Sequence, residues 1–208
     1  MTPYPLPVGI VDVGIGNVGS VANMLRKIGN DAIIIQRPDQ LEKLNKLILP
    51  GVGRFDKGIQ ALEKMGFIDS IHHFSNRDDT SLLGICLGMQ MLFEGSEEGD
   101  KPGLGFIPGH VERFKESIQL PIPHVGWTTT NSTQSNLLFS NLDKAFFYFV
   151  HAYHAPRGIL ESEFCLATSE YGYKFPSAVG KGRVMGVQFH PEKSLSFGFQ
   201  LLRNFVNY

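Results

Sequence analysis

The sequence predicts an α/β fold: a mostly parallel sheet flanked by helices, with an additional antiparallel β part. Two observations carry this prediction. In the first half of the chain, short apolar runs alternate with segments of helical periodicity, which is typical of βαβ units. In the second half, strand-like segments follow one another, separated by glycine and proline, until a final helical segment.

In the first half, short apolar runs predict strands over residues 8–13, 32–35, 46–49 and 82–85. The first run ends in a glycine-rich turn, and Pro50 and Gly51 stop the third. Helical spacing of apolar residues predicts helices that alternate with these strands. These helices cover residues 17–28, 55–65 and 87–93.

The second half predicts the antiparallel part. Its strand-like segments cover residues 103–114, 121–130, 145–153, 164–169 and 177–189. The chain then closes with a helix over residues 195–206, in which Leu195, Phe199, Leu202 and Phe205 share one face. Because no repeat and no low-complexity linker separates the halves, we expect a single domain over residues 1–208.

Composition narrows the class of protein. The chain has 208 residues, with 19 Lys and Arg against 20 Asp and Glu, and 42% of its residues are hydrophobic. A net charge of −1 argues against a dedicated nucleic-acid binder, and the hydrophobic content argues against disorder. No apolar run approaches the ~18 residues that span a membrane.

The N-terminal segment and the cysteines indicate a reducing compartment. Residues 1–7 contain neither a basic nor an apolar stretch, so no signal peptide is expected. The only two cysteines, Cys86 and Cys165, lie in unlike contexts and do not suggest a disulfide scaffold. We therefore expect a cytoplasmic protein that has no membrane partner.

A glycine-rich turn near the N-terminus offers an alternative function. Residues 14–19 fit G-x-G-x-x-G between a strand and a helix, as in dinucleotide-binding folds. The second strand, however, ends in Gln36 and Arg37, where an acid would hold the ribose. Arg37 suits a 2′-phosphate, but nothing later supplies a hydride-transfer site. An ordinary strand-to-helix turn is the favoured interpretation.

The strongest local motif is G-x-C-x-G, centred on Cys86 between a predicted strand and helix. It has the form of a nucleophile elbow, in which Gly84 and Gly88 avoid collisions with neighbouring backbone. The sulfur would lie at the carboxyl edge of the sheet, and the following helix N-terminus would favour the thiolate. The amide of Leu87 is placed to donate to an oxyanion. The alternative is a buried structural cysteine.

A nucleophilic cysteine needs a base, and the base needs an orienting group. Of the seven histidines, His190 ends a predicted strand and is followed by Pro191 and Glu192. Pro191 stops the strand, so Glu192 can reach back to the imidazole. Cys86, His190 and Glu192 together suffice for acyl transfer. The alternative for His190 is a capped strand end.

A second oxyanion donor should come from a neighbouring strand end. The Pro-Gly-x-Gly segment after the third strand presents backbone N–H groups there, so Val52 and Gly53 are candidates beside Leu87. No spacing of residues suits a metal site, and we expect neither a metal nor a cofactor.

Taken together, these motifs resemble the class I glutamine amidotransferases. More narrowly, the chain is similar to the family of glutaminase subunits of imidazole glycerol phosphate synthase. The resemblance extends over nearly the whole chain and is specific because the motifs occur in order. They lie at residues 49–53, 84–90, 96–98, 103–105, 111–114, 123–127, 148–151, 171–172 and 188–194.

The resemblance implies a flavodoxin-like fold and hydrolysis of glutamine to glutamate and ammonia. Cys86 would be the nucleophile, His190 the acid and base, and Glu192 its orienting group. The substrate would be bound by Gly51, Gln90, Glu98, His151, Ala152 and Tyr153, with Glu98 paired with the substrate ammonium.

The resemblance also implies a partner that uses the ammonia. In this family the partner is a (β/α)8 cyclase, which forms a heterodimer with the glutaminase and receives ammonia through a tunnel. Its products are imidazole glycerol phosphate and an aminoimidazole carboxamide ribotide of histidine biosynthesis. The chain alone would be a hydrolase and the whole synthase a lyase. Asn17, Tyr148 and Lys193 would face the partner, and the glycine-rich turn would belong to this docking surface.

Some positions depart from the family pattern, namely Val13, Thr128, Ala152 and His154. None belongs to the expected triad, but they leave the pathway open. The alternative is a paralogous amidotransferase that supplies ammonia to a cyclase-like partner in surface-polysaccharide synthesis. A non-catalytic scaffold and a stand-alone cysteine hydrolase acting on γ-glutamyl or peptide bonds are further alternatives.

Overall fold

The computed structural model describes residues 6–208, without the side chain of Ile118. Most of the N-terminal segment 1–7, on which the prediction about targeting rests, lies outside the described residues. The strands are β1 (Val8–Val11), β2 (Ala32–Ile35), β3 (Lys46–Gly51), β4 (Ser81–Cys86), β5 (Phe93–Ser96), β6 (Ile107–Arg113), β7 (His124–Ser132), β8 (Ala145–His151), β9 (Tyr153–His154), β10 (Cys165–Tyr171), β11 (Tyr173–Lys181) and β12 (Val184–Val187). The helices are α1 (Val18–Lys27), α2 (Phe55–Lys64), α3 (Phe67–Ser75), α4 (Leu87–Gln90) and α5 (Leu195–Val206).

The main sheet has nine strands in the order β2-β1-β3-β4-β12-β11-β10-β7-β8. The first five strands of this order run parallel, and each remaining neighbour pairs antiparallel. A smaller sheet joins β5, β6 and β9. The predicted α/β fold, with its parallel sheet and its antiparallel part, is therefore confirmed.

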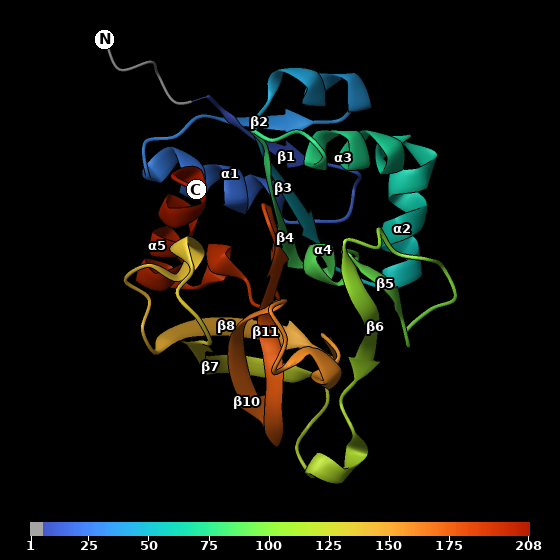
Figure 1. The fold of residues 1–208 in the computed structure, drawn as a ribbon, viewed down its shortest axis with the longest axis vertical. Helices are drawn as coiled ribbons and strands as arrows, with labels where there is room; N and C mark the ends of the chain where they lie inside the picture. The colour runs from blue at the N-terminus through green and yellow to red at the C-terminus, as the bar shows by residue number, and fades with distance from the viewer. Residues whose placement is uncertain (1–5) are drawn as a thin grey trace.

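Helices cover both faces of the parallel strands (Figure 1). α1 and α5 lie on one face, where Leu25 and Phe205 belong to one buried apolar cluster. α2 and α3 lie on the other face, where Phe55 and Phe74 belong to a second cluster. Because the inner parallel strands β1, β3, β4 and β12 are buried on both faces, they read as apolar runs rather than as alternating patterns, whereas Ile33 and Ile34 of the edge strand β2 are exposed.

Strand pairing sets the edge at which function is expected. β4 lies between β3 and β12, with Gly51 opposite Cys86 and Val187 opposite Ile85. Parallel strands end at the same edge of a sheet, where open α/β folds bind ligands. The segments that follow β3, β4 and β12 therefore meet at one place.

Three predicted elements differ from the structure because tertiary pairing overrides the local pattern. The helix expected over 87–93 ends at Gln90, and Phe93 instead begins β5, opposite Ile107 of β6. The strand expected over 177–189 is part of a hairpin, β11 and β12, whose turn contains Gly182 with a φ of 59°. The strand expected over 145–153 is likewise divided between β8 and β9.

The glycine-rich turn is a strand-to-helix connection held by its own side chains. The first strand ends at Val11, and Asp12 accepts a hydrogen bond from the Gly14 N–H at 3.1 Å. A methyl group at Gly19 would meet no atom within 4 Å, so close helix–strand packing does not require the third glycine. Arg37 pairs with Asp39 at 3.1 Å.

Within residues 6–208, no helix is both long enough and apolar enough to cross a bilayer.

The turn between β4 and α4 generates a stability prediction. A Cβ atom at Gly88 would overlap the backbone carbonyl of Leu49, whereas one at Gly19 meets open space inside α1. We expect Gly88→Ala to lower the free energy of unfolding by at least about 3 kcal/mol, since backbone cannot move aside cheaply. Gly19→Ala, the matched control, should raise it by about 0.5–1 kcal/mol. Urea unfolding of both variants checks this, and near-equal stabilities would contradict it.

Candidate active site

Cys86 lies at the sharp turn that joins β4 to α4. Its φ of 55° is one of the few positive values at a described non-glycine residue, which marks the backbone as strained. A Cβ atom at Gly84 would come within 2.6 Å of the Gly88 carbonyl carbon, and one at Gly88 would overlap the Leu49 carbonyl. Both glycines are therefore required by close backbone approach, as the motif predicts.

α4 comprises only the four residues from Leu87 to Gln90. The sequence predicts a longer helix here, whose macrodipole would favour a thiolate. A single turn contributes the N–H groups of its first residues rather than a sizeable macrodipole. The predicted length of this helix is wrong because the chain leaves the helix to form β5.

His190 follows β12 and is held by the strand beside it. Its backbone N–H donates to the Tyr148 carbonyl at 2.9 Å. Its Nδ1 lies 2.7 Å from Glu192 Oε1, and both side chains are only 2% exposed. Since the carboxylate accepts, Nδ1 carries the hydrogen and Nε2 is the nitrogen left for Cys86. Among the described residues, Nε2 has no hydrogen-bond partner.

The charge of His190 is set by two opposing effects. Burial lowers the pKa of this imidazole, but its interactions with Cys86 and Glu192 outweigh burial and raise the pKa to about 10. His190 is therefore cationic at neutral pH. A cation beside a thiol favours the thiolate, which is the nucleophilic form of cysteine.

Cys86 and His190 share a cavity of about 270 Å³. Most of the site residues predicted from the sequence line it together. The lining residues are Val52, Gly53, Cys86, Leu87, Gln90, Glu98, Pro123, Val150, His151, Ala152, Tyr153 and His190. Glu192 lies behind His190, and Gly51 pairs with Cys86 in the sheet.

The candidate oxyanion donors lie on two sides of Cys86. Leu87 begins the single turn of α4, and Val52 and Gly53 follow β3. Gly53 has a φ of 107°, a conformation that favours glycine. Val52 is 46% exposed although it lines the cavity, so this wall is open to solvent.

Gln90 and Glu98 are held by backbone groups. Gln90 Nε2 donates to the Tyr153 carbonyl at 3.0 Å and to Gln188 Oε1 at 3.2 Å. Glu98 Oε2 accepts the Phe55 N–H at 2.8 Å, which satisfies a free donor at the start of α2. Oε2 of Glu98 is thus used to hold the start of α2. Glu98 also lines the cavity, so its other oxygen, Oε1, is the one left for a ligand.

Two residues near Cys86 have roles that the sequence analysis did not assign. Gln188 Nε2 donates to the Cys86 sulfur at 3.8 Å, and the thiol donates to the Val150 carbonyl at 3.9 Å. The available signal was only that Gln188 stands two residues before His190, just after β12 ends at Val187. No local pattern indicates Val150, because it reaches Cys86 from a distant strand.

Of the predicted partner residues, Tyr148 and Lys193 lie together. Lys193 Nζ is 5.4 Å from the Tyr148 ring centre. Asn17 is exposed at the start of α1, which follows the carboxyl end of β1 and so lies at the same edge of the sheet. Its side chain accepts the Ser20 N–H at 3.4 Å.

Beside this pair is an exposed apolar surface that we call the docking face. It comprises Val125 and Trp127 of β7 and Phe146 of β8. Trp127 stacks on Phe146 with ring centres 6.3 Å apart and contacts Tyr148 edge-on at 6.0 Å. Clustered exposed apolar side chains mark interaction sites.

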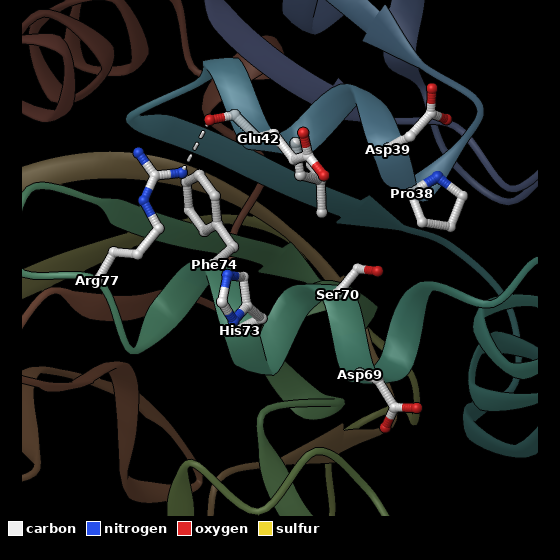
Figure 2. Close-up of a pocket in the computed structure, with 9 residues that line it drawn as sticks. Pro38, Asp39, Glu42, Asp69, Ser70, His73, Phe74 and Arg77 are labelled. Atoms are coloured by element: carbon white, nitrogen blue, oxygen red, sulfur yellow. Dashed lines mark hydrogen bonds between the residues drawn. The ribbon is translucent and has the colours of Figure 1, made fainter.

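A larger cavity, of about 470 Å³, lies away from Cys86, between the turn 38–43 and α3 (Figure 2). Asp39, Glu42 and Asp69 line it, and Arg77 donates to the Glu42 carbonyl at 3.3 Å. No cysteine lines it, and among the described residues no hydrogen bond joins its His73 to a carboxylate, unlike His190 and Glu192. The described residues also contain no group of three or more His, Cys, Asp or Glu side chains suited to a metal ion. The chemistry therefore points to the smaller cavity.

Known proteins resemble the chain over almost its full length. The family model Glutamine amidotransferase class-I matches residues 9–207. Subunit HisH 2 of imidazole glycerol phosphate synthase from Methanococcus maripaludis is 48% identical over 201 residues, covering 96% of this chain and 98% of the relative. Subunit HisH from Desulfitobacterium hafniense is 44% identical over 200 residues, covering 95% and 92%.

A crystal structure of a glutamine amidotransferase superposes with a TM-score of 0.75 and 23% identity, covering 96% of this chain and 97% of the other. At that identity the likeness shows the fold alone.

The two cysteines should differ in reactivity. Burial raises the pKa of Cys165 to about 11, and this residue is 1% exposed, whereas Cys86 lines the cavity beside a cationic imidazole. We expect iodoacetamide at neutral pH to alkylate Cys86 alone in the folded protein and both cysteines after denaturation. Peptide mass spectrometry reads this out. Labelling of Cys165 first would contradict the site geometry.

The raised pKa of His190 predicts a pH-dependent stability. A group whose folded pKa is above its ordinary value of 6.5 stabilises the fold fully below that value and loses this contribution as pH rises toward about 10. We expect the stability difference between wild type and His190→Gln to shrink steadily between about pH 6.5 and pH 10. Urea unfolding across this range measures it. A difference that stays constant over this range would mean that His190 is neutral in the folded state.

Proposed function

The chain belongs to the class I glutamine amidotransferase family, and we propose that it is the glutaminase subunit of an imidazole glycerol phosphate synthase. The observation that carries this proposal is that Cys86 and His190 line one cavity while Glu192 is hydrogen-bonded to His190 from behind. The identity of 48% to a HisH subunit over nearly the whole of both chains supports it. The reaction is hydrolysis of glutamine to glutamate and ammonia.

The proposed chemistry uses the three groups in sequence. The Cys86 thiolate attacks the γ-amide carbon, and His190 gives its proton to the leaving ammonia, so a thioester forms. Water then attacks the thioester while His190 takes a proton from it, and glutamate leaves with Cys86 restored. Glu192 keeps the imidazole oriented throughout. The N–H groups of Leu87 and of the Val52–Gly53 segment stabilise the negative oxygen at each step.

The proposed substrate position follows from the charges around the cavity. The side chain of Glu98 binds the glutamine ammonium with the oxygen that Phe55 does not use. Gln90 and the backbone of residues 151–153 form the opposite wall, and Gly51 gives Leu87 room to turn. The cavity of about 270 Å³ is small, which suits a free amino acid better than a peptide.

The partner is proposed to be a (β/α)8 cyclase subunit that takes up the ammonia. The docking face, with Tyr148 and Lys193 beside it, offers the apolar surface that such a heterodimer needs. Asn17 contributes from the same edge of the sheet. Tyr148 also joins this surface to the site, because its carbonyl accepts the His190 N–H. Both free cysteines fit a reducing compartment, so we propose the cytoplasm as the location.

Glutamate release from glutamine tests this function. We expect strong stimulation when a histidine-pathway cyclase subunit with its ribulosyl phosphate ligand is added to the chain. Cys86→Ala should lower the stimulated rate at least about a thousandfold, as removal of a nucleophile does. Cys165→Ala, the matched control, removes the other cysteine and should retain the rate.

Three outcomes would contradict the proposal. Full activity of Cys86→Ala would show that Cys86 is not the nucleophile. If the chain hydrolyses glutamine but no histidine-pathway cyclase stimulates it, the amidotransferase chemistry stands. The partner would then be a cyclase-like subunit of another pathway. Cleavage of peptides or γ-glutamyl compounds without any partner would indicate a stand-alone hydrolase.

A further inference from the structure

A line of hydrogen bonds runs from the surface of β7 to the cavity wall. Thr128 Oγ1 lies 2.9 Å from His124 Nε2, and His124 Nδ1 lies 3.0 Å from His151 Nε2. His151 Nδ1 lies 2.8 Å from the Tyr153 carbonyl oxygen. We call these three side chains, Thr128, His124 and His151, the histidine relay. None of them belongs to the Cys86–His190–Glu192 set.

The direction of every bond in the relay follows from its last acceptor. A carbonyl oxygen only accepts, so His151 carries its hydrogen on Nδ1. In a neutral ring Nε2 then accepts, and the hydrogen of His124 must also lie on Nδ1. His124 Nε2 accepts in turn, so the Thr128 hydroxyl donates. Burial lowers the pKa of His124 to about 4 and that of His151 well below its usual range, so both rings are neutral at pH 7.

The relay is held rigidly by its surroundings. His124 and His151 are directly opposite each other in the β7–β8 pair. The His124 ring stacks between Tyr171 at 4.1 Å and Phe149 at 5.0 Å. A ring held on both faces has one orientation available, so its hydrogen bonds hold His151 in one place.

The relay ends at the Tyr153 carbonyl oxygen, which is part of the proposed substrate-binding wall. The Tyr153 carbonyl accepts both His151 Nδ1 and Gln90 Nε2. His151, Tyr153 and Gln90 all line the cavity that contains Cys86. A change in the His151 ring therefore changes the position of this wall without touching the reacting atoms.

We propose that Thr128 and His124 are positioning residues that set the affinity for glutamine through the Tyr153 carbonyl. This inference rests on the proposed glutaminase function. Neither side chain lines the cavity. Because the relay shapes the binding wall rather than the nucleophile, its loss should raise KM and leave kcat nearly unchanged.

Steady-state kinetics of three variants tests the relay. Thr128→Val keeps the shape of the side chain but cannot donate to His124, and we expect KM for glutamine to rise about three- to tenfold with kcat within about twofold, as for loss of one hydrogen bond. Thr128→Ser restores the hydroxyl and should restore KM. Thr168→Val is the matched control, since this threonine lies on β10 and lines neither the cavity nor the docking face. Thermal unfolding checks that each variant is folded.

Nitrogen-15 NMR of the histidine rings gives a readout that does not depend on activity. At pH 7 we expect His124 and His151 of the wild type as neutral rings with the hydrogen on Nδ1. In Thr128→Val the Nε2 resonance of His124 should shift, because that nitrogen loses its donor. A hydrogen on Nε2 of either ring, or a positive charge on either, would overturn the relay.

The kinetic outcomes separate the relay from the proposed function. An unchanged KM in Thr128→Val, or a loss in kcat alone, would overturn the relay while the glutaminase assignment stands. A wild-type chain that releases no glutamate with any cyclase partner would overturn the proposed function. The hydrogen positions would then still be decided by the NMR spectra.

Discussion

The parallel pairing of β4 with β12 is the constraint on which the site depends. Val187 lies opposite Ile85, so the two strands end side by side at one edge of the sheet. Cys86 ends the first strand, and His190 follows the second. A slip of one residue in this register would turn every side chain of a strand to the other face and separate the two groups. The fold thereby brings together residues that are distant in the sequence.

Burying the polar side chains of the site costs free energy unless each of them is hydrogen-bonded. Glu192 and His190 are almost fully buried, and their direct hydrogen bond offsets part of the desolvation cost. Ser194 holds the turn around them, because its hydroxyl donates to the His190 carbonyl at 2.6 Å and accepts the Tyr148 N–H at 3.0 Å. The proposed base is therefore attached to β8, the strand that also forms the docking face. A partner that presses on this face would act on a strand bonded directly to His190.

Sequence analysis could predict those parts of the molecule that depend on local chemistry. The turn at Cys86 was predictable because glycines flank it, and Glu192 was predictable because Pro191 stops the strand. The short α4 was not, since an apolar run fits both helix and strand until Phe93 pairs with β6. The contact of His124 with His151 joins residues on two paired strands, and no local pattern indicates it. The residues expected from the family resemblance do gather at the cavity, but their roles remain proposals.

We propose that Cys86 attacks glutamine inside the cavity it shares with His190. A crystal structure of the chain after reaction with a glutamine-like electrophile, such as a chloroketone analogue of glutamine, tests it most directly. We predict a covalent bond to the Cys86 sulfur, the former carbonyl oxygen at the Leu87 N–H and the ammonium at Glu98. Attachment at Cys165, or an analogue bound in the cavity beside Arg77, would contradict the account.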